Sequence, residues 1–176
     1  MRNKIYFALS LLGLLFACTK PEPEPQKPEI KGRLNALKNG EAWEAYAHGR
    51  TNNFNTAKLL LFFTAEENNL DIECTVRNIP RVTGKYYPIS NENIKPSNDS
   101  VINASCYISD YDLLLADYDL MEDSTNVVTI DTYDAVADKY SGTLNLIFVV
   151  NRKNDDLGLP DTIRIKNGVF FGEVLR

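Results

Sequence analysis

The sequence has little histidine and cysteine and lacks the common catalytic motifs, and these absences argue against several classes of enzyme. His48 is the only histidine among 176 residues, so one chain cannot build a multi-histidine metal centre. A serine triad would need His48, yet no Gly-x-Ser-x-Gly motif is present. Gly-x-Gly-x-x-Gly and phosphate-loop patterns are also missing. We therefore expect no enzyme activity and no cofactor.

Positive charge is also scarce. The chain has 19 lysines and arginines against 24 acidic residues, and its formal net charge is −5. Nucleic-acid binding uses stripes of lysine and arginine, and electrostatic adhesion to anionic lipid uses similar clusters. Because no such cluster is present, we expect no nucleic-acid partner and no attachment to membranes by charge alone.

The one long apolar run of the sequence lies at its start. Arg2 and Lys4 precede 13 uncharged residues, 5–17, and small Ala17 stands directly before Cys18. The run is too short to span a bilayer as a permanent helix. A positive beginning, a short apolar run and a small residue are typical of a secretory signal peptide, which we predict over residues 1–17.

The segment that ends at Cys18 resembles a bacterial lipobox, Leu15-Phe16-Ala17-Cys18. This resemblance implies cleavage before Cys18 and a diacylglycerol attached to its sulfur, because the thiolate is the nucleophile that takes the lipid. Two or more acyl chains give stable anchoring. The expected location is the bacterial cell envelope, as an outer-membrane lipoprotein on the periplasmic or surface-exposed face.

Residues 18–30 read as a tether between this anchor and a folded domain. They hold four prolines and three glutamates and almost no apolar side chains. Proline fixes φ and removes a backbone donor, so such a segment favours extended, solvated polyproline II. Residues 31–176 are long enough to bury one core, and we predict a single domain there.

Turn residues and alternating hydrophobicity predict about ten short β-strands in this domain and no helix. Asn39-Gly40, Asn68-Asn69 and Asn167-Gly168 predict three tight hairpin turns, because asparagine and glycine tolerate positive φ. The expected strands are Leu34–Lys38, Glu41–His48, Lys58–Glu66, Leu70–Ile79, Gly84–Ile89, Val101–Ser109, Leu113–Met121, Val127–Tyr133, Tyr140–Val150, Thr162–Lys166 and Val169–Leu175.

Alternation also indicates which strand faces are buried. Residues 70–77 are apolar at every even position, so one face is solvated. Residues 59–63 are apolar throughout, which indicates a central strand. Residues 140–150 place the longest apolar set on one face. The predicted fold is an antiparallel β-sandwich, and an up-and-down lipocalin-like barrel is the alternative.

Three short motifs carry a family resemblance. Asn39-Gly40 is followed by Trp43, residues 140–144 read Tyr-Ser-Gly-Thr-Leu, and residues 163–170 read Ile-Arg-Ile-Lys-Asn-Gly-Val-Phe. Together with the lipobox, these motifs are similar to those of uncharacterised secreted lipoproteins of Bacteroidota, although Leu144 replaces the phenylalanine usual there. The resemblance implies a secreted all-β domain and supplies no catalytic residues.

Cys74 and Cys106 remain once Cys18 carries a lipid. An even pair in an oxidising compartment favours a disulfide. Both cysteines lie on the apolar side of their expected strands, which equally fits two separate buried thiols. A bond requires Cα atoms within about 7 Å, so the sequence leaves both alternatives open.

An acidic repeat raises the question of a metal site. Asp110-Tyr111-Asp112-Leu113 recurs seven residues later as Asp117-Tyr118-Asp119-Leu120. Carboxylates are calcium ligands, but the EF-hand spacing is missing. A shift of seven residues also reverses the face of a strand. We expect a solvated hairpin and no metal.

Aromatic residues provide the candidate ligand face, because aromatic rings stack on sugars and line apolar pockets. The alternative is that the tryptophan belongs to the core and the tyrosines border the strands. The leading functional hypothesis is a non-enzymatic envelope domain that binds a macromolecule, such as a protein, or a glycan. The alternative is a carrier whose barrel encloses a small apolar ligand. The candidate ligand-face residues are Trp43, Tyr86, Tyr87, Tyr111 and Tyr118.

Overall fold

The structure is a computed structural model that describes residues 32–53, 55–90, 101–123 and 125–175. Within them the chain forms ten strands and one short 3₁₀ helix, η2 (Asp155–Leu157), so the all-β prediction is confirmed. The predicted signal peptide, Cys18 and the tether lie outside the described residues. The strands are β1 (Arg33–Lys38), β2 (Glu41–Asn52), β3 (Asn55–Glu67), β4 (Leu70–Pro80), β5 (Gly84–Tyr86), β6 (Asn103–Asp110), β7 (Leu113–Leu120), β8 (Val127–Asp134), β9 (Lys139–Lys153) and β10 (Thr162–Leu175).

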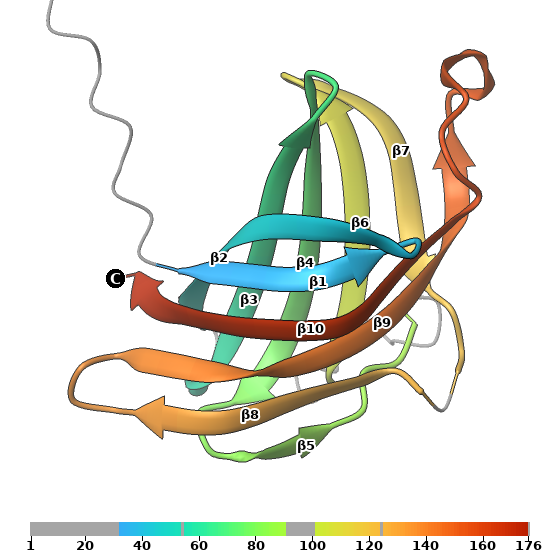
Figure 1. Cartoon of the computed structure of the whole chain (residues 1–176). Coiled ribbons are helices and arrows are strands. Elements are labelled where there is room, and N and C mark those ends of the chain that lie inside the picture. Colours follow the sequence, from blue (N-terminus) through green and yellow to red (C-terminus); the bar gives the residue numbers. More distant parts are fainter. Residues whose placement is uncertain (1–31, 54, 91–100, 124, 176) are drawn as a thin grey trace, which may run out of the picture.

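All ten strands belong to one sheet whose pairings return to their start. The order is β1-β10-β2-β3-β4-β6-β7-β9-β8-β5, and β1 also pairs with β2 and β10 with β9. A path from β10 through β1, β2, β3, β4, β6, β7 and β9 therefore leads back to β10. Figure 1 shows β1, β10, β9 and β8 side by side, running across β3, β4, β6 and β7. One sheet thus provides two crossing walls around a core, an arrangement that shares features with sandwiches and barrels.

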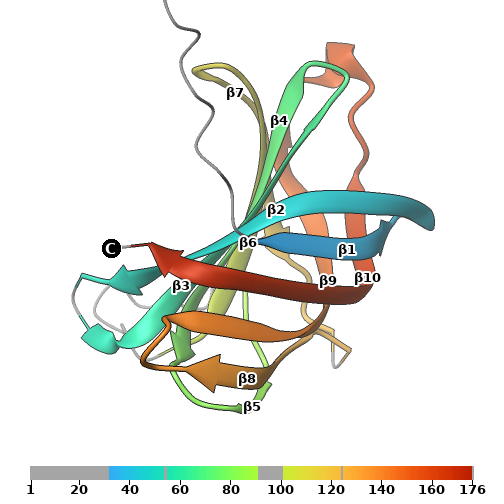
Figure 2. The ribbon, with the colours of Figure 1, turned by 60° about the vertical axis from the view of Figure 1, so that its left-hand side comes forward.

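The long strand β9 joins the two walls. Along one edge it pairs with β10. Along the other edge, Lys139–Asn145 pair with β8 and Phe148–Lys153 pair with β7. The short strand β5 continues the sheet beyond β8. Figures 1 and 2 show that β10 ends beside the start of β1, where Arg33 pairs with Phe171.

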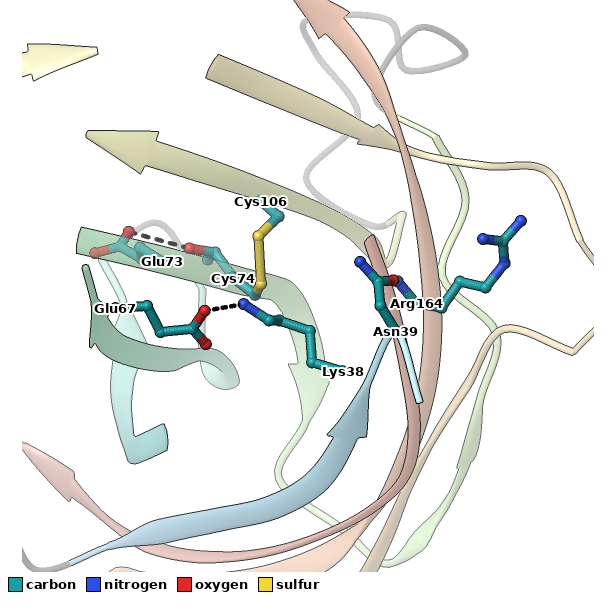
Figure 3. Close-up of a disulfide and its surroundings, with 8 residues drawn as sticks. Lys38, Asn39, Glu67, Glu73, Cys74, Cys106 and Arg164 are labelled. Atoms are coloured by element: carbon teal, nitrogen blue, oxygen red, sulfur yellow. Dashed lines mark hydrogen bonds and ion pairs between the residues drawn. A yellow bond between two sulfur atoms is a disulfide. The ribbon is translucent and has the colours of Figure 1, made fainter. Parts of the chain in front are cut away.

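Two of the three predicted hairpin turns are confirmed. Asn39 and Gly40 join β1 to β2 with φ of 52° and 92°, and Asn68 and Asn69 join β3 to β4 with φ of 53° and 63°. Asn39 also forms hydrogen bonds with Arg164 of β10, and both residues are labelled in Figure 3. Its backbone N–H donates to the Arg164 carbonyl at 2.9 Å, and its side-chain oxygen accepts the Arg164 N–H at 2.8 Å.

The predicted terminal hairpin at Asn167-Gly168 is wrong. Strand β10 continues through both residues, and its register with β9 shifts between Ile165 and Gly168. Asn167 has a positive φ of 53°, but Gly168 does not, whereas a type I′ turn needs positive φ at both positions. The Asn-Gly pair therefore forms a β-bulge, which bends the strand without reversing it.

Aromatic side chains fill much of the space between the walls. The Phe63 and Phe170 rings meet edge to face with centroids 5.4 Å apart, and Tyr140 lies 6.0 Å from Phe170. The predicted inward positions of β9 are confirmed, since Leu144, Leu146 and Phe148 are buried. The largest fully buried side chains are Tyr118, Tyr140, Phe63, Phe148, Phe170, Leu34, Leu59, Leu61, Ile79, Ile130, Leu144 and Leu146.

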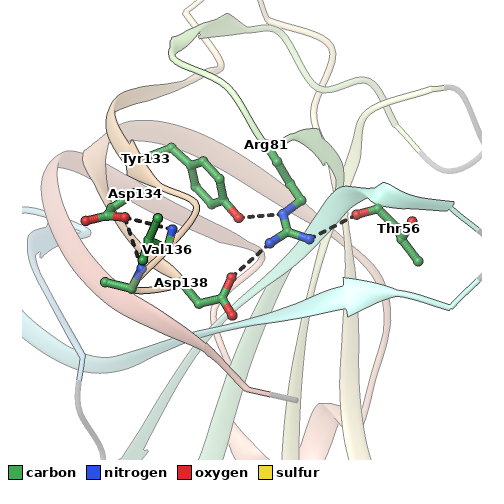
Figure 4. Close-up of polar contacts among 7 residues, drawn as sticks. Thr56, Arg81, Tyr133, Asp134, Val136 and Asp138 are labelled. Carbon is green, nitrogen blue, oxygen red and sulfur yellow. Dashed lines mark hydrogen bonds and ion pairs between the residues drawn. The ribbon is translucent and has the colours of Figure 1, made fainter.

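Polar contacts cross the sheet near each end of β3. At its C-terminal end, Lys38 of β1 forms an ion pair with Glu67 (Figure 3), and the Lys38 ammonium lies 5.8 Å from the centre of the Trp43 ring. Near its N-terminal end, Arg81 binds Asp138 and Tyr133 from the β8–β9 hairpin, as Figure 4 shows. These contacts link strands that are distant in the sequence.

Candidate functional site

The structure does not bring the five predicted ligand-face residues together. Trp43 and Tyr118 belong to the core, with exposed fractions of 6% and 1%. The Tyr118 hydroxyl donates a hydrogen bond of 2.9 Å to the Pro160 carbonyl. Neither ring is placed to stack against a ligand from solvent. This agrees with the alternative that the tryptophan is a core residue.

The other three tyrosines lie near opposite ends of β4. Tyr86 follows the end of β4 on β5, where its hydroxyl donates to the Val82 carbonyl at 2.8 Å, and Tyr87 is exposed beside it. Tyr111 lies on the β6–β7 turn, near the start of β4, and is 90% exposed. A strand of 11 residues separates the two positions, so one small ligand cannot contact both.

Cys74 and Cys106 are joined by a disulfide in the structure, drawn in Figure 3. They are directly opposed on β4 and β6, and their Cα atoms are 4.0 Å apart. Both are fully buried. The bond therefore links two adjacent strands inside the core and is not placed for exchange with thiols in solvent.

His48 packs as an aromatic side chain on the outside of β2. Its ring stacks on Phe62 with centroids 4.9 Å apart and an interplanar angle of 9°. Burial lowers the His48 pKa, and the nearby charge of Arg50 lowers it further. A neutral imidazole stacked in this way serves packing between β2 and β3.

A row of exposed side chains crosses β2, β1 and β10 on the outer face of the sheet. Arg33 pairs directly with Tyr46 on one side and with Phe171 on the other. Directly paired residues point to the same face, and Tyr46 and Phe171 are 54% and 53% exposed. Because adjacent strands lie about 4.8 Å apart, the two aromatic residues are separated by about 10 Å. We call Tyr46, Arg33 and Phe171 the aromatic row.

The aromatic row ends at a hollow on the outer surface of β3 and β4. Tyr46 pairs with Thr64, which pairs with Glu73, so the same row of the sheet continues into this hollow. Its volume is about 340 Å³. We call it the Tyr46 hollow, and it is lined by Tyr46, Thr64, Ala65, Glu66, Asp71, Ile72, Glu73 and Ser109.

Charge is distributed unevenly along this surface. The Arg33 guanidinium is paired with Glu44 at 2.8 Å, so the centre of the aromatic row is close to neutral. The Tyr46 hollow has three carboxylates, Glu66, Asp71 and Glu73, and no cation in its lining. Hydroxyl and carboxylate oxygens there can accept hydrogen bonds. The surface therefore combines two aromatic platforms with a set of acceptors.

Two further hollows lined by described residues do not combine exposed aromatic rings with hydrogen-bond acceptors. One, of about 310 Å³, lies over the buried Trp43, where Lys38 is already paired with Glu67. Another, of about 260 Å³, lies between β7 and β9 and is lined by Asp119, Val149 and neighbouring residues. Neither is lined by an exposed aromatic side chain.

Sequence reasoning missed Tyr46 and Phe171, although a signal for each was present. Trp43, Ala45 and Ala47 alternate toward the core, so Tyr46 had to point outward. Phe170 and Phe171 are adjacent, so their rings point to opposite faces of the strand. Neither pattern indicates that β1 brings the two exposed rings into one row.

Within the described residues, no helix is long and apolar enough to cross a membrane. In the same ranges, no three histidine, cysteine or acidic side chains are grouped to hold a metal ion. No protein-family model, curated protein or solved structure matches the chain.

Proposed function

We propose that this protein is a lipid-anchored, non-enzymatic binding module of the bacterial cell envelope, which holds a macromolecule or a glycan on the aromatic row and the Tyr46 hollow. The observation that carries the proposal is the exposure of Tyr46 and Phe171 on either side of Arg33. Aromatic and arginine side chains dominate the energetics of binding surfaces. The anchor at Cys18 would keep this surface at the membrane.

The packing of the interior supports a surface site over the carrier alternative. Phe63, Phe148 and Phe170 occupy the space between the walls and are at most 1% exposed. The carrier hypothesis expects a cavity lined by residues from the strands of Leu59, Leu70 and Leu144. Leu59 and Leu144 are instead buried in the same core, and Leu70 packs against it. The Tyr46 hollow, in contrast, lies on the outer surface of β3 and β4.

The anchor is tested by replacing Cys18 with serine in the natural host. We expect the wild-type protein to incorporate a labelled fatty acid and to fractionate with the outer membrane. The Cys18→Ser chain should incorporate no label, because the acceptor thiol is absent. Equal labelling of both chains would contradict the proposed anchoring.

The binding surface is tested by native mass spectrometry of protein purified gently from the same host. We expect a bound component in the wild type that is lost in Phe171→Ala. Tyr87→Ala is the matched control, because it removes an exposed aromatic ring at the opposite end of β4 from the Tyr46 hollow. If the component persists in Phe171→Ala and is lost in Tyr87→Ala, the surface is wrongly assigned.

A further inference from the structure

We propose that the ligand of this surface is an uncharged polysaccharide, bound across β2, β1 and β10 with sugar rings stacked on Tyr46 and Phe171. This inference rests on the proposed function, because it names the ligand class of the same surface. It is argued from the spacing of the rings, the pairing of the charges and the lining of the Tyr46 hollow.

The spacing of the aromatic rings fits an extended chain of sugars. Tyr46 and Phe171 lie about two strand spacings, or about 10 Å, apart, which is comparable with the repeat of an extended disaccharide. Each is about half exposed, so part of each side chain is open to solvent. The apolar C–H face of a sugar packs on such a ring while its hydroxyls stay solvated.

The groups beyond the two rings suit hydroxyl-bearing ligands. The row continues from Phe171 to Ser141 and Thr132, whose hydroxyls lie 2.7 Å apart. At its other end are the hydroxyls and carboxylates of the Tyr46 hollow. A sugar ring on Tyr46 would have these oxygens as acceptors for its hydroxyl hydrogens.

The charges select a neutral chain over an acidic one. Arg33 is already neutralised by Glu44, and Lys139, farther along the same wall, is paired with Glu173 at 3.4 Å. Glu66, Asp71 and Glu73 place negative charge where the next sugar would lie. A uronic acid or phosphate at that position would be repelled, so the charges of the Tyr46 hollow disfavour an acidic polysaccharide.

The test is affinity electrophoresis of the full lipidated chain in a polyoxyethylene detergent. The native gels contain a neutral polysaccharide, namely a β-1,4-glucan, a β-1,3-glucan, a galactomannan or starch, or an acidic one, polygalacturonate or alginate. We expect retardation by at least one neutral polymer and none by the acidic polymers. Tyr46→Ala and Phe171→Ala should each weaken this binding by roughly tenfold or more, as loss of an aromatic anchor does.

Three controls make the result specific. Tyr46→Phe should retain binding, because it keeps the ring. Tyr87→Ala should bind as the wild type does, because its exposed ring lies at the opposite end of β4 from the Tyr46 hollow. The emission of Trp43, the only tryptophan and a core residue, reports whether each variant is folded.

Each other outcome overturns the inference. Retardation by acidic polymers, or by neutral polymers equally in Phe171→Ala, would contradict the assigned chemistry. If no polysaccharide binds but a host protein binds the wild type and not Phe171→Ala, the proposed function stands and the ligand class is wrong. If Phe171→Ala abolishes the binding of neither a polysaccharide nor a host protein, both the ligand class and the proposed function fail.

Discussion

Arg81 and Asp138 form a partly buried ion pair that joins the end of β4 to the β8–β9 hairpin. One guanidinium N–H donates to the Asp138 carboxylate at 2.9 Å (Figure 4). The same guanidinium donates to the Tyr133 hydroxyl at 2.5 Å and to the Thr56 carbonyl at 3.2 Å. A single side chain therefore connects segments from β3, β8 and the turn before β9.

Arg81→Ala should lower the free energy of unfolding by about 2–4 kcal/mol, because it removes hydrogen bonds from a charged donor and leaves a shielded carboxylate without this partner. Urea unfolding followed by Trp43 emission measures the change. Arg152→Ala is the control, since Arg152 is 72% exposed and 3.7 Å from Asp117, and it should cost less than about 1 kcal/mol. Equal losses in both variants would contradict this role for Arg81.

The Cys74–Cys106 disulfide closes a loop with a sequence separation of 32. Thiol labelling of the denatured, unreduced protein should therefore modify neither cysteine. Replacing both by alanine should lower stability by about 3–4 kcal/mol, the loss of unfolded-state entropy for a loop of this length. Two labelled thiols in the wild type would show that the bond does not form.

Gly142 has no room for a side chain. A Cβ there would lie 1.9 Å from the Thr129 carbonyl oxygen and 2.8 Å from Cζ of Phe170. Gly142→Ala should destabilise the domain by about 3 kcal/mol or more, because the backbone of β8 would have to move. The side chain of the neighbouring Ser141 points outward, so Ser141→Ala should lower the free energy of unfolding by less than about 1 kcal/mol. Similar midpoints of denaturation for the two variants would rule out this close approach.

Alkaline pH should destabilise the protein through its buried tyrosines. Burial, with a smaller effect of the Asp161 charge, raises the pKa of Tyr118 to about 12, and burial also raises the pKa of Tyr140. The folded state favours the neutral phenol, whereas an unfolded tyrosine ionises near pH 10. This stabilisation is complete below about pH 10 and is lost as the pH rises through the folded-state pKa.

Tyr140→Phe tests this pH dependence. The Tyr140 hydroxyl is buried and has no hydrogen-bond partner among the described residues, so the variant should be at least as stable as the wild type near neutral pH. The stability difference between the variant and the wild type should grow in favour of phenylalanine above about pH 10. A difference that stays constant across this range would refute the assignment to Tyr140.

Local patterns in the sequence were sufficient for the strands and for most of their buried faces. Alternation over residues 70–77 and 140–150 identified the inward side chains, because side chains of a strand alternate between two faces. Asn39-Gly40 and Asn68-Asn69 identified two turns, since their φ requirement is local. Asn167-Gly168 has the same local signal, yet the register imposed by β9 makes it a bulge.

By itself the sequence determined the all-β class and the apolar sides of most strands, because these follow from the chemistry of a few neighbouring residues. Only the tertiary structure decided that Cys106 faces Cys74 and that Tyr46 and Phe171 flank Arg33. These relationships depend on which strands become neighbours and in what register. That choice is made by the closure of the whole sheet around one core, and no short stretch of sequence specifies it.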